Sequence, residues 1–458
     1  MSNPGDSDDT PIGSVQQLAD YIAVGAKPKS EWRIGTEHEK FGFRRDDFRP
    51  PPYEPRGIRE LLERIARPGR WEPILDRGAP IGLTGVGEAK YASVSLEPAG
   101  QLELSGGLAR TLHETEAELE SHFAEVRAAS EPLGLGFSPL GFHPTMRRDE
   151  MPWMPKSRYA IMRRYMPLVG NLGLDMMTRT CTVQVNLDYS SEDDMARKLR
   201  VSLAFQPVAT ALFANSPFIE GKPSGLLSSR ARVWTDTDPD RTGMPAMMLE
   251  DGFTFERYVA WLLDVPMYFV LRNGHYHDVA GHSFRDFMRE GQNSVPGVRA
   301  TLGDFADHMT TAFTDVRVKR FLEMRGADAG RPDMMLAQSA FWTGLLYDKA
   351  ALAAADALMR THPAADYLAL RDEVPRLALD TPFGSGSVRD LARDLLVIAD
   401  DGLRSRSYRD GNGADERRFL DPLRPLVMGE PTQAEQWLAA FHGEWNGDVS
   451  KIFNASAV

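Results

Sequence analysis

Hydrophobic and polar residues alternate most regularly at residues 179–189. One set of alternating positions is apolar and the other is polar. Because successive side chains of a strand point to opposite faces, this pattern predicts a β-strand with one face in the core and the other in a polar environment. The apolar set is Cys181, Val183, Val185 and Leu187, and the polar set is Thr180, Thr182, Gln184, Asn186 and Asp188.

The same patterns predict further strands and helices around this one. Residues 32–43 and 91–105 favour extended structure. Helical apolar spacing is present at residues 15–25, 57–66 and 192–214. Thr111 is placed to cap a further helix at residues 109–129.

The second half of the chain changes character. A loop rich in Gly, Ser, Arg and Asp at residues 221–243 is long enough to act as a lid or a binding loop. The last 120 residues or so read mostly as helices, with breaks at residues 363, 381–387 and 410–414.

Nothing in the sequence divides the chain into separate domains. The 458 residues contain no repeat of fixed period and no long low-complexity linker. The predicted architecture is therefore an α+β fold in one domain spanning residues 1–458. Within it we expect a disordered tail at residues 1–14, a sheet-bearing part at about 30–330 and a mainly helical part at 331–458.

Composition excludes several kinds of partner. A net charge of −12 repels nucleic acid. The apolar stretches are too short to cross a bilayer, and the polar, acidic start does not resemble a signal peptide. We therefore expect a cytoplasmic protein that binds neither nucleic acid nor membrane. The sequence leaves open whether it is a monomer or a homodimer. The single cysteine, Cys181, excludes an internal disulfide and a thiolate zinc cluster.

A first pair of candidate metal ligands lies in the strand predicted at residues 32–43. Alternation places Glu37 and Glu39 on one face, while His38 and Lys40 point the opposite way. Two carboxylates on a buried face repel each other unless cations, arginines or protons neutralise them. The alternative is an exposed edge strand of alternating charge.

Glu97 and Glu103 form a second pair, which can return to one face across the kink made by Pro98 and Gly100. Magnesium prefers oxygen ligands and completes its shell with water and nucleotide phosphates. Four carboxylates from adjacent strands would therefore suit magnesium bound to ATP. A solvated acidic sheet face is the alternative interpretation.

Several arginines are candidates for facing these carboxylates. Guanidinium groups bind carboxylate and phosphate through paired hydrogen bonds, although any single arginine can equally be a surface residue. The chain has no P-loop, no Rossmann-type glycine motif and no G-x-S-x-G, so ATP would be held mainly through metal and arginines. The candidates are Arg158, Arg163, Arg164, Arg179, Arg230, Arg232 and Arg325.

Long segments of the chain resemble plant-type glutamate–cysteine ligases. Residues 32–43, W-R-I-G-T-E-H-E-K-F-G-F, are similar to the opening strand of that family. Residues 93–106 resemble its L-E-P-x-G-Q-x-E-L-S-G segment, and residues 174–188 resemble its L-D-M-M-x-R-T-C-T-V-Q-V-N-L-D segment. Further similar segments follow in order, so that the resemblance covers nearly the whole chain, at 211–222, 234–243, 264–268, 324–328 and 341–348.

The resemblance implies a glutamine-synthetase-like fold, in which a curved antiparallel sheet carries the active site, helices pack on its outer face and the C-terminal part is helical. It also implies that ATP phosphorylates the γ-carboxylate of glutamate and that the amine of cysteine then attacks the acyl phosphate. The product would be γ-glutamylcysteine, made in the first step of glutathione biosynthesis. ATP and Mg²⁺ are the implied cofactors.

The resemblance further implies roles for individual residues. The implied metal ligands are Glu37, Glu39, Glu97, Glu103 and Glu323. The implied glutamate contacts are Arg158, Thr182, Arg230 and Tyr268. Lys40, Gln184 and Arg325 are implied to bind the nucleotide, with Arg230 and Arg325 as catalytic residues and Arg325 as a clamp on the phosphate or acyl phosphate.

Two other functions remain open from the sequence. One is a γ-glutamyl ligase with a different amine acceptor, since no residue identifies a pocket for the thiol. The other is a non-catalytic paralogue that binds ATP or glutamate, which the presence of all four sheet carboxylates disfavours. The regulatory cysteine pairs of the plant enzymes are missing, and Glu116 stands where one of those cysteines falls, so disulfide control of the plant kind is excluded within this chain.

Overall fold

The computed structural model describes residues 8–290 and 298–458. Its centre is a nine-stranded antiparallel sheet with the order β14-β15-β7-β1-β5-β4-β3-β2, and β6 pairs with the far half of β1. The strands are β1 (Ile34–Arg44), β2 (Trp71–Asp76), β3 (Ala79–Gly85), β4 (Ser93–Leu96), β5 (Leu102–Ser105), β6 (Leu135–Ser138), β7 (Thr182–Leu187), β14 (Val316–Val318) and β15 (Leu322–Asp328).

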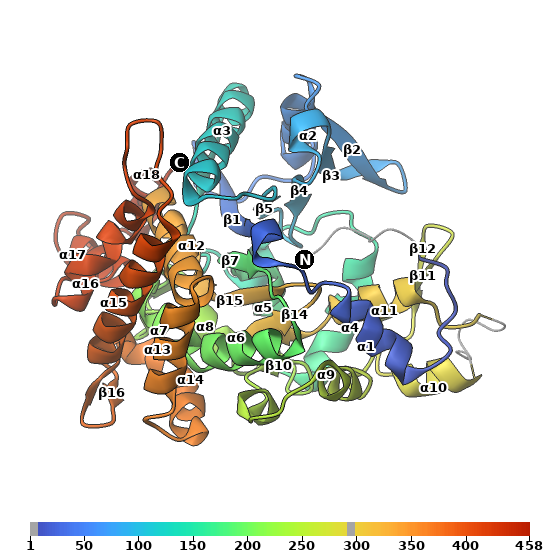
Figure 1. Cartoon of the computed structure of the whole chain (residues 1–458). Helices are drawn as coiled ribbons and strands as arrows, with labels where there is room; N and C mark the ends of the chain where they lie inside the picture. Colours follow the sequence, from blue (N-terminus) through green and yellow to red (C-terminus); the bar gives the residue numbers. More distant parts are fainter. Residues whose placement is uncertain (1–7, 291–297) are drawn as a thin grey trace.

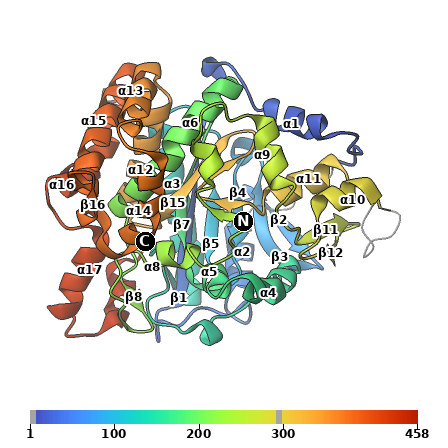
Figure 2. The ribbon, with the colours of Figure 1, turned by 90° about the horizontal axis from the view of Figure 1, so that it is seen from below.

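Helices pack against one face of this sheet and continue into a helical C-terminal part (Figures 1 and 2). The helices of the first half are α1 (Val15–Ala23), α2 (Ile58–Ala66), α3 (Leu112–Ser130), α4 (Arg158–Val169), α5 (Gly173–Arg179), α6 (Glu192–Ala204), α7 (Gln206–Leu212), α8 (Ser229–Trp234) and α9 (Phe255–Leu262). Those of the second half are α10 (Phe284–Glu290), α11 (Leu302–Met309), α12 (Pro332–Leu346), α13 (Lys349–Met359), α14 (Ala364–Leu377), α15 (Val388–Arg406), α16 (Arg424–Val427), α17 (Gln433–His442) and α18 (Ile452–Ala455).

The alternation of apolar and polar residues decides which face of the sheet meets the helices. Val183 and Val185 of β7 lie in the core with side chains of α6, α7 and α12. From α12, Gln338 Nε2 donates to the Val183 carbonyl at 3.0 Å, and Ser339 Oγ lies 2.8 Å from Thr36 Oγ1 of β1. The polar face therefore remains on the other side, towards α4, α5 and α8 (Figure 2). The predicted α+β class and antiparallel sheet are confirmed.

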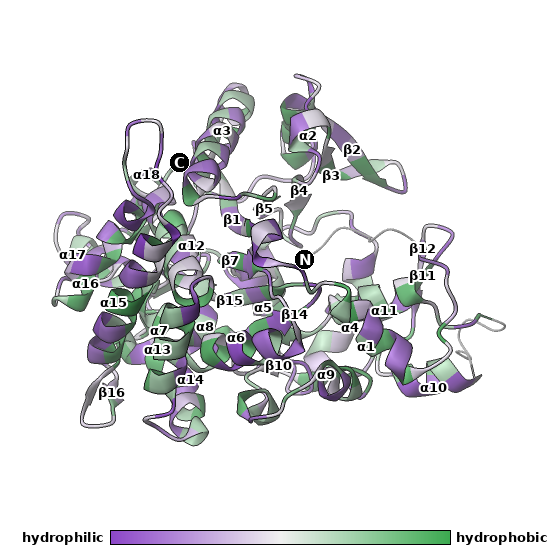
Figure 3. Ribbon diagram, viewed as in Figure 1, coloured by the Kyte–Doolittle hydropathy of each residue, from purple (hydrophilic) through white to green (hydrophobic). Residues whose placement is uncertain are grey.

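Helix α12 is buried over almost its whole length because it lies between the sheet and α15. Gly344 allows the close approach: a Cβ atom there would lie 2.4 Å from the Ala399 carbonyl oxygen of α15. Helix α15 has an exposed side as well, and in Figure 3 its ribbon mixes hydrophilic and hydrophobic colours. Among the described residues, no helix is both long and apolar enough to cross a membrane.

Some predicted elements differ from the structure. The helix expected at residues 192–214 is two helices, α6 and α7, that meet at Phe205, because Pro207 has no N–H to continue the ladder and its ring crowds the preceding turn. The extended segment at 91–105 is a hairpin. Its turn contains Pro98 and ends at Gly100, whose φ of +87° suits glycine.

Two segments expected to be irregular are ordered by packing. Residues 8–14 of the predicted tail are held to residue 300 and its neighbours, since Ile12 N donates to the Ala300 carbonyl at 3.0 Å and Ser14 caps α1. Residues 1–7 lie outside the described part. The loop at 221–243 contains helix α8, whose N-cap is Ser228 and whose residues Ser229, Arg230 and Val233 are buried. Short-range sequence signals miss both cases because distant segments supply the contacts.

Cys181 lies immediately before β7 and has no exposed surface. Its side chain packs in a cluster with Phe41, Leu140 and Ala329. Burial raises the pKa of this thiol well above its usual value. The residue is thus a small core side chain, as the alternation predicted.

Candidate active site

Carboxylates line the polar face of the central strands. In the ladder between β1 and β5, Glu39 stands directly opposite Glu103, which places their Cβ atoms about 4.5–5.5 Å apart. Glu37 stands two residues earlier on the same face, opposite Gln184 of β7. Glu97 follows β4 at the start of the hairpin turn. Glu39, Glu97 and Glu103 are all buried.

Neutral donors from neighbouring strands hold these carboxylates in place. Asn186 Nδ2 donates to Glu37 at 2.7 Å, and the backbone N–H of Thr182 donates to Glu39 at 2.9 Å. Ser95 Oγ donates to Glu103 at 2.5 Å. None of these donors carries a positive charge, so they orient the acids without cancelling their charge.

The close packing of acids makes the ionised forms of Glu37 and Glu39 costly. Burial, followed by the charges of Glu323 and Glu103, raises the pKa of Glu37 to about 7. Burial, followed by Glu97 and Glu103, raises the pKa of Glu39 to about 8. Raised values of this kind mark a cluster with excess negative charge, which protons or a bound cation would relieve.

The donor set of this cluster fits Mg²⁺ in chemistry. Carboxylate oxygens are the ligands that Mg²⁺ prefers, and the uncompensated charge on Glu37 and Glu39 would favour a divalent cation. The protein oxygens alone do not complete a cage: in the described part of the chain, no group of three or more acidic, histidine or cysteine side chains is arranged around a common point. This is the usual situation for Mg²⁺, which keeps water and phosphate ligands.

Glu323 of β15 has a different environment from the other acids. It has no exposed surface, and Arg317 donates to both of its oxygens at 2.7 and 3.0 Å. Lys319 Nζ lies 2.8 Å away, and Arg325 also pairs with it. Although burial alone would raise its pKa, Arg317, Lys319 and Arg325 hold the pKa of Glu323 well below its usual range. With three cations around it, Glu323 anchors a positive cluster here, and the structure gives no support to its predicted role as a metal ligand.

Arg325 connects this cationic cluster to the carboxylates. Its Nη1 donates to Gln184 Oε1 as well as pairing with Glu323, and the Gln184 amide in turn donates to Glu37 at 3.4 Å. A guanidinium beside a row of acids is the arrangement that phosphate binding next to a cation requires. The structure thus brings together Arg325, Gln184 and Glu37.

Arg230 of α8 is buried beside β15. Its guanidinium donates to the carbonyls of Arg325 at 2.9 Å and Gly326 at 3.3 Å. The buried carboxylate of Asp328 fixes this arrangement, because it accepts from Ser216 Oγ at 2.6 Å and from Ser228 Oγ, the cap of α8, at 2.8 Å. Sequence reasoning missed Asp328, and only its position at the end of a strand near Arg325 was available as a signal.

The other predicted glutamate contacts lie around the same face but are not all directed at it. Arg158 is the first residue of α4 and is buried, and the charge of Glu97 stabilises its guanidinium. Thr182 turns its hydroxyl to the Ala327 carbonyl at 2.7 Å. Tyr268 is buried beneath the Arg241 guanidinium, 4.0 Å from the ring centre. Thr182 contacts the carboxylate row through its backbone N–H, which donates to Glu39 at 2.9 Å, and its hydroxyl is directed away from the row. Arg158 interacts with Glu97 through its charge, and the Tyr268 side chain packs against Arg241.

Lys40 lies on the opposite face of the sheet from the carboxylates. Its Nζ contacts the Leu102 carbonyl at 3.3 Å and His38 Nδ1 at 3.4 Å, over the ring of Phe123 in α3. Lys40 lies on this face because successive side chains of β1 point to opposite faces of the sheet, which separates Lys40 from Glu37 and Glu39 as predicted. The implied nucleotide contact of Lys40 is therefore not supported by the geometry.

Other polar residues of the site were not singled out from the sequence. Asn186 belongs to the polar face of the predicted strand at 179–189, so alternation was the available signal. Arg317 lies between Val316 and Val318 on β14, a strand too short to recognise by pattern alone, and Lys319 directly follows that strand. Lys156, which donates to the Leu96 carbonyl at 3.0 Å, had no sequence signal.

Comparison with known proteins identifies the class. The sequence profile of glutamate-cysteine ligase family 2 matches residues 33–455. Chloroplastic glutamate–cysteine ligases from Brassica juncea and Arabidopsis thaliana are each 49% identical to the chain over 438 residues. That region covers 96% of this chain and 83% and 82% of those proteins. The chain therefore belongs to glutamate–cysteine ligase family 2, which confirms the resemblance.

A solved structure shares the fold at low sequence identity. The glutamate–cysteine ligase of Francisella tularensis, crystallised in complex with AMP, superposes with a TM-score of 0.55 at 11% identity. The match covers 93% of this chain and 87% of that one. It extends the similarity from sequence to the arrangement of sheet and helices.

The predicted cytoplasmic location is contradicted by the comparisons. The plant relatives at 48–49% identity are named as chloroplastic enzymes. The prediction rested on a polar N-terminus and on short apolar stretches, which argue against a secretory signal peptide but do not distinguish one aqueous compartment from another.

Proposed function

We propose that the protein is an ATP-dependent glutamate–cysteine ligase that forms γ-glutamylcysteine, the first step of glutathione biosynthesis. The observation that carries the proposal is the combination of family membership over residues 33–455 with a buried row of carboxylates facing Arg325. Such a ligase must bring together a nucleotide, a carboxylate substrate and an amine, and must neutralise the charge of all three.

The reaction proceeds in two balanced steps. A γ-carboxylate oxygen of glutamate attacks the γ-phosphorus of ATP, ADP leaves, and γ-glutamyl phosphate forms. The neutral amine of cysteine then attacks the acyl carbon, phosphate leaves with the bonding electrons, and the nitrogen loses a proton. Both steps build negative charge on phosphoryl oxygens, which fixed guanidinium groups stabilise at little reorganisation cost.

Within this chain we assign the charged residues to those tasks. Arg325 would bind the transferred phosphoryl group, because it already spans Gln184 and Glu323 next to the carboxylates. Arg230, held by the carbonyls of β15, and Arg158 would bind the glutamate substrate. Glu37, Glu39, Glu97 and Glu103 would hold Mg²⁺, which when bound would neutralise the polyphosphate.

An acceptor comparison tests the proposal. Purified protein with ATP, Mg²⁺ and glutamate is expected to release ADP when cysteine is added, and to form the dipeptide in equal amount. Other amino acids serve as matched acceptors. ADP release that favours another amine would identify a different γ-glutamyl ligase, and no ADP release with any acceptor would identify a non-catalytic paralogue.

The raised pKa values predict how the stability of the metal-free protein depends on pH. Between the usual carboxyl pKa of 4.5 and the value of about 7 for Glu37, the folded state holds more protons than the unfolded state. Stability contributed by this group is therefore lost as pH rises through that window. Thermal unfolding in EDTA from pH 5 to 7 should show that the wild type loses more stability than Glu37→Gln.

The comparison is made between variants because other buried groups act in the opposite direction. Burial lowers the pKa of His38 well below its usual value and that of Lys40 to about 7, so their contributions rise with pH. These groups are unchanged in Glu37→Gln and cancel in the difference. Parallel pH profiles for the two proteins would contradict the predicted ionisation of Glu37.

A further inference from the structure

Strand β15 contains a β-bulge at the residue proposed to bind the phosphoryl group. The pairing of β15 with β7 shifts between Met324 and Ala327, where two residues of β15, Arg325 and Gly326, stand opposite one residue of β7. A bulge of this kind bends a strand and redirects its side chains, and bulges are frequent next to active sites. The geometry of this bulge therefore decides where the Arg325 side chain points.

The extra residue also changes which side chains of β15 reach the polar face. On a regular strand, side chains three residues apart point to opposite faces of the sheet. Met324 and Ala327 nevertheless both lie in the core. Arg325 and Asp328 both lie on the polar side, where Asp328 accepts a hydrogen bond from the cap of α8. The bulge is what allows the proposed phosphoryl clamp and the anchor of α8 to share one face.

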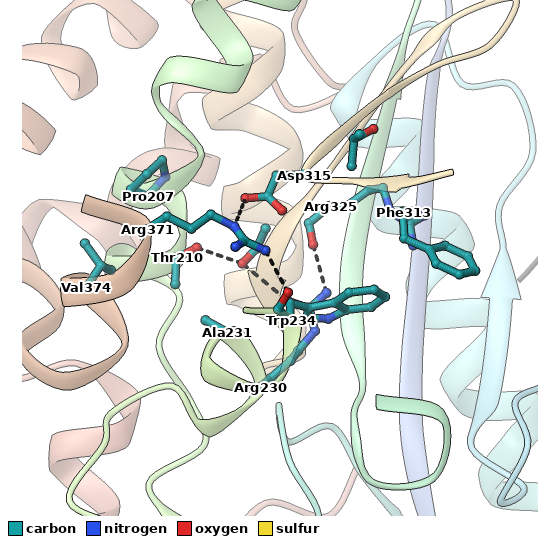
Figure 4. A pocket seen from close by; sticks show the side chains of 12 residues that line it. Pro207, Thr210, Arg230, Ala231, Trp234, Phe313, Asp315, Arg325, Arg371 and Val374 are labelled. Carbon is teal, nitrogen blue, oxygen red and sulfur yellow. Dashed lines mark hydrogen bonds and ion pairs between the residues drawn. The ribbon is translucent and has the colours of Figure 1, made fainter. Parts of the chain in front are cut away.

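Two side chains of α7 bind the backbone of the bulge. Gln206 Oε1 accepts from the N–H of Gly326 at 2.8 Å. Thr210 Oγ1 donates to the carbonyl of the same residue at 2.9 Å (Figure 4). Gln206 and Thr210 are four residues apart, so they lie on one side of the helix, and both are buried. Helix α7 thus supplies the hydrogen-bond partners that a bulged residue loses from the strand ladder.

The fit between Gln206 and the bulge is close. A Cβ atom at position 326 would lie 2.4 Å from Gln206 Oε1, so a larger residue than Gly326 would displace the glutamine. Gln206 is only 1% exposed, and its Nε2 has no partner within the described residues. The hydrogen bond of its side chain to Gly326 is therefore the specific contact that this glutamine makes.

The bulge also carries the contacts of a second guanidinium group. From α8, Arg230 donates to the carbonyls of Arg325 and Gly326, as Figure 4 shows. The N–H of Arg325 donates to the Asp315 carbonyl at 2.9 Å and so continues the ladder towards β14. The position of the bulge thus sets two guanidinium groups at once, one attached to the strand and one bound to its backbone.

We propose that Gln206 and Thr210 are positioning residues for the ligase reaction, and that they act through the β15 bulge on Arg325 and Arg230. This inference rests on the proposed function, since Arg325 is the phosphoryl clamp of that reaction. When the contact with Gly326 is lost, the bulge relaxes and the Arg325 guanidinium moves away from the transferred phosphoryl group. A displacement of about 1 Å at a reacting group can lower turnover by about 100-fold.

The first test is Gln206→Met, which keeps the length of the side chain but removes the acceptor for the Gly326 N–H. Steady-state ADP release with glutamate, cysteine and Mg-ATP should show kcat lowered by about 10- to 100-fold. The KM for glutamate should also rise, by about 3- to 10-fold, because Arg230 is bound to the same segment. Partial unfolding alone would lower kcat and leave every KM unchanged, because the folded molecules would be unaltered.

Gln338→Met is the matched control. Gln338 of α12 is equally buried, and it donates from the same layer of helices to the backbone carbonyl of Val183 in the neighbouring strand β7. Its replacement should lower the melting temperature about as much as Gln206→Met does. Its kcat and its KM for glutamate should stay within about twofold of the wild type.

A double-mutant cycle with Arg325→Lys separates an effect through Arg325 from a general loss of packing. Lysine keeps a positive charge at the site, so turnover stays measurable, but it lacks the forked guanidinium that the bulge directs. In this background Gln206→Met should lower kcat by less than about threefold, well below its effect in the wild type. Equal losses in both backgrounds would overturn the proposal.

Thr210 provides an independent pair of variants, which carries the test if Gln206→Met does not fold. Thr210→Val keeps the shape of the side chain and removes its hydroxyl, whereas Thr210→Ser keeps the hydroxyl. The valine variant should lose kcat, although less than Gln206→Met, because Arg230 still donates to the Gly326 carbonyl. The serine variant should restore wild-type kcat, and equal kcat values for the two variants would count against the proposal.

The outcomes separate this inference from the proposed function. If the wild type releases no ADP with glutamate and cysteine, the proposed function fails. If the wild type is active but Gln206→Met has the same kcat and KM values as Gln338→Met, the positioning inference is wrong and the proposed function stands.

Discussion

Replacing Glu37 or Glu103 by glutamine is expected to lower the turnover of ADP formation by well over about tenfold, the loss typical of a disturbed metal site. Glutamine keeps the shape of the side chain but removes the negative charge. Its carbonyl can still accept from Asn186 at position 37 or from Ser95 at position 103, so the strands should stay paired. The measurement is kcat under saturating glutamate, cysteine and Mg-ATP.

Glu72→Gln is the control for this pair, since Glu72 lies in the same sheet on β2 and is exposed. It should retain wild-type kcat. Because Glu37 is destabilised by burial and by neighbouring acids, Glu37→Gln should also unfold at the same or a higher temperature than the wild type in EDTA. Wild-type kcat in both Glu37→Gln and Glu103→Gln would show that the row of carboxylates takes no part in the reaction.

The second large effect is expected on stability. Glu323→Ala should lower the free energy of unfolding by about 3–5 kcal/mol, because it leaves Arg317 buried without its partner. Urea unfolding of the wild type and the variant measures the difference. The exposed pair of Glu250 and Arg257 provides the control, and Glu250→Ala should cost at most about 1 kcal/mol.

Acidification of the wild-type protein should reproduce part of the loss of stability expected for Glu323→Ala. The pKa of Glu323 is held well below its usual value of 4.5, so its contribution to stability is present above that value and is lost as pH falls through the lower folded value. The gap in stability between the wild type and Glu323→Ala should therefore narrow in acid. A gap below about 1 kcal/mol at neutral pH would show that the cationic cluster is stable without its central acid.

Much of the sheet could be predicted from the sequence because one rule governs it, the alternation of side chains between the two faces of a strand. Alternation alone separated Glu37 and Glu39 from Lys40, and it assigned Gln184 and Asn186 to the polar face. The pairing of Glu39 with Glu103 was not accessible, since register depends on the hairpin turn and on long-range packing.

The charges that surround each acid could not be predicted from the sequence either. Glu323 and Glu37 belong to the same polar face, yet one is surrounded by three cations and the other by carboxylates and amides. That difference arises from β14, a three-residue strand that brings Arg317 against Glu323. Similarly, the position of α8 depends on Asp328, which accepts a hydrogen bond from the cap residue Ser228, 100 residues away along the chain.

The burial of Cys181 has a consequence for an enzyme that handles thiols. Thiol–disulfide exchange needs an accessible thiolate, and the only cysteine of the chain is enclosed in the core with a raised pKa. While folded, the protein has no sulfur that can form a mixed disulfide with cystine or with an oxidised product. Oxidation of the surrounding thiol pool would then slow the enzyme through depletion of free cysteine, while the thiol of Cys181 stays unchanged.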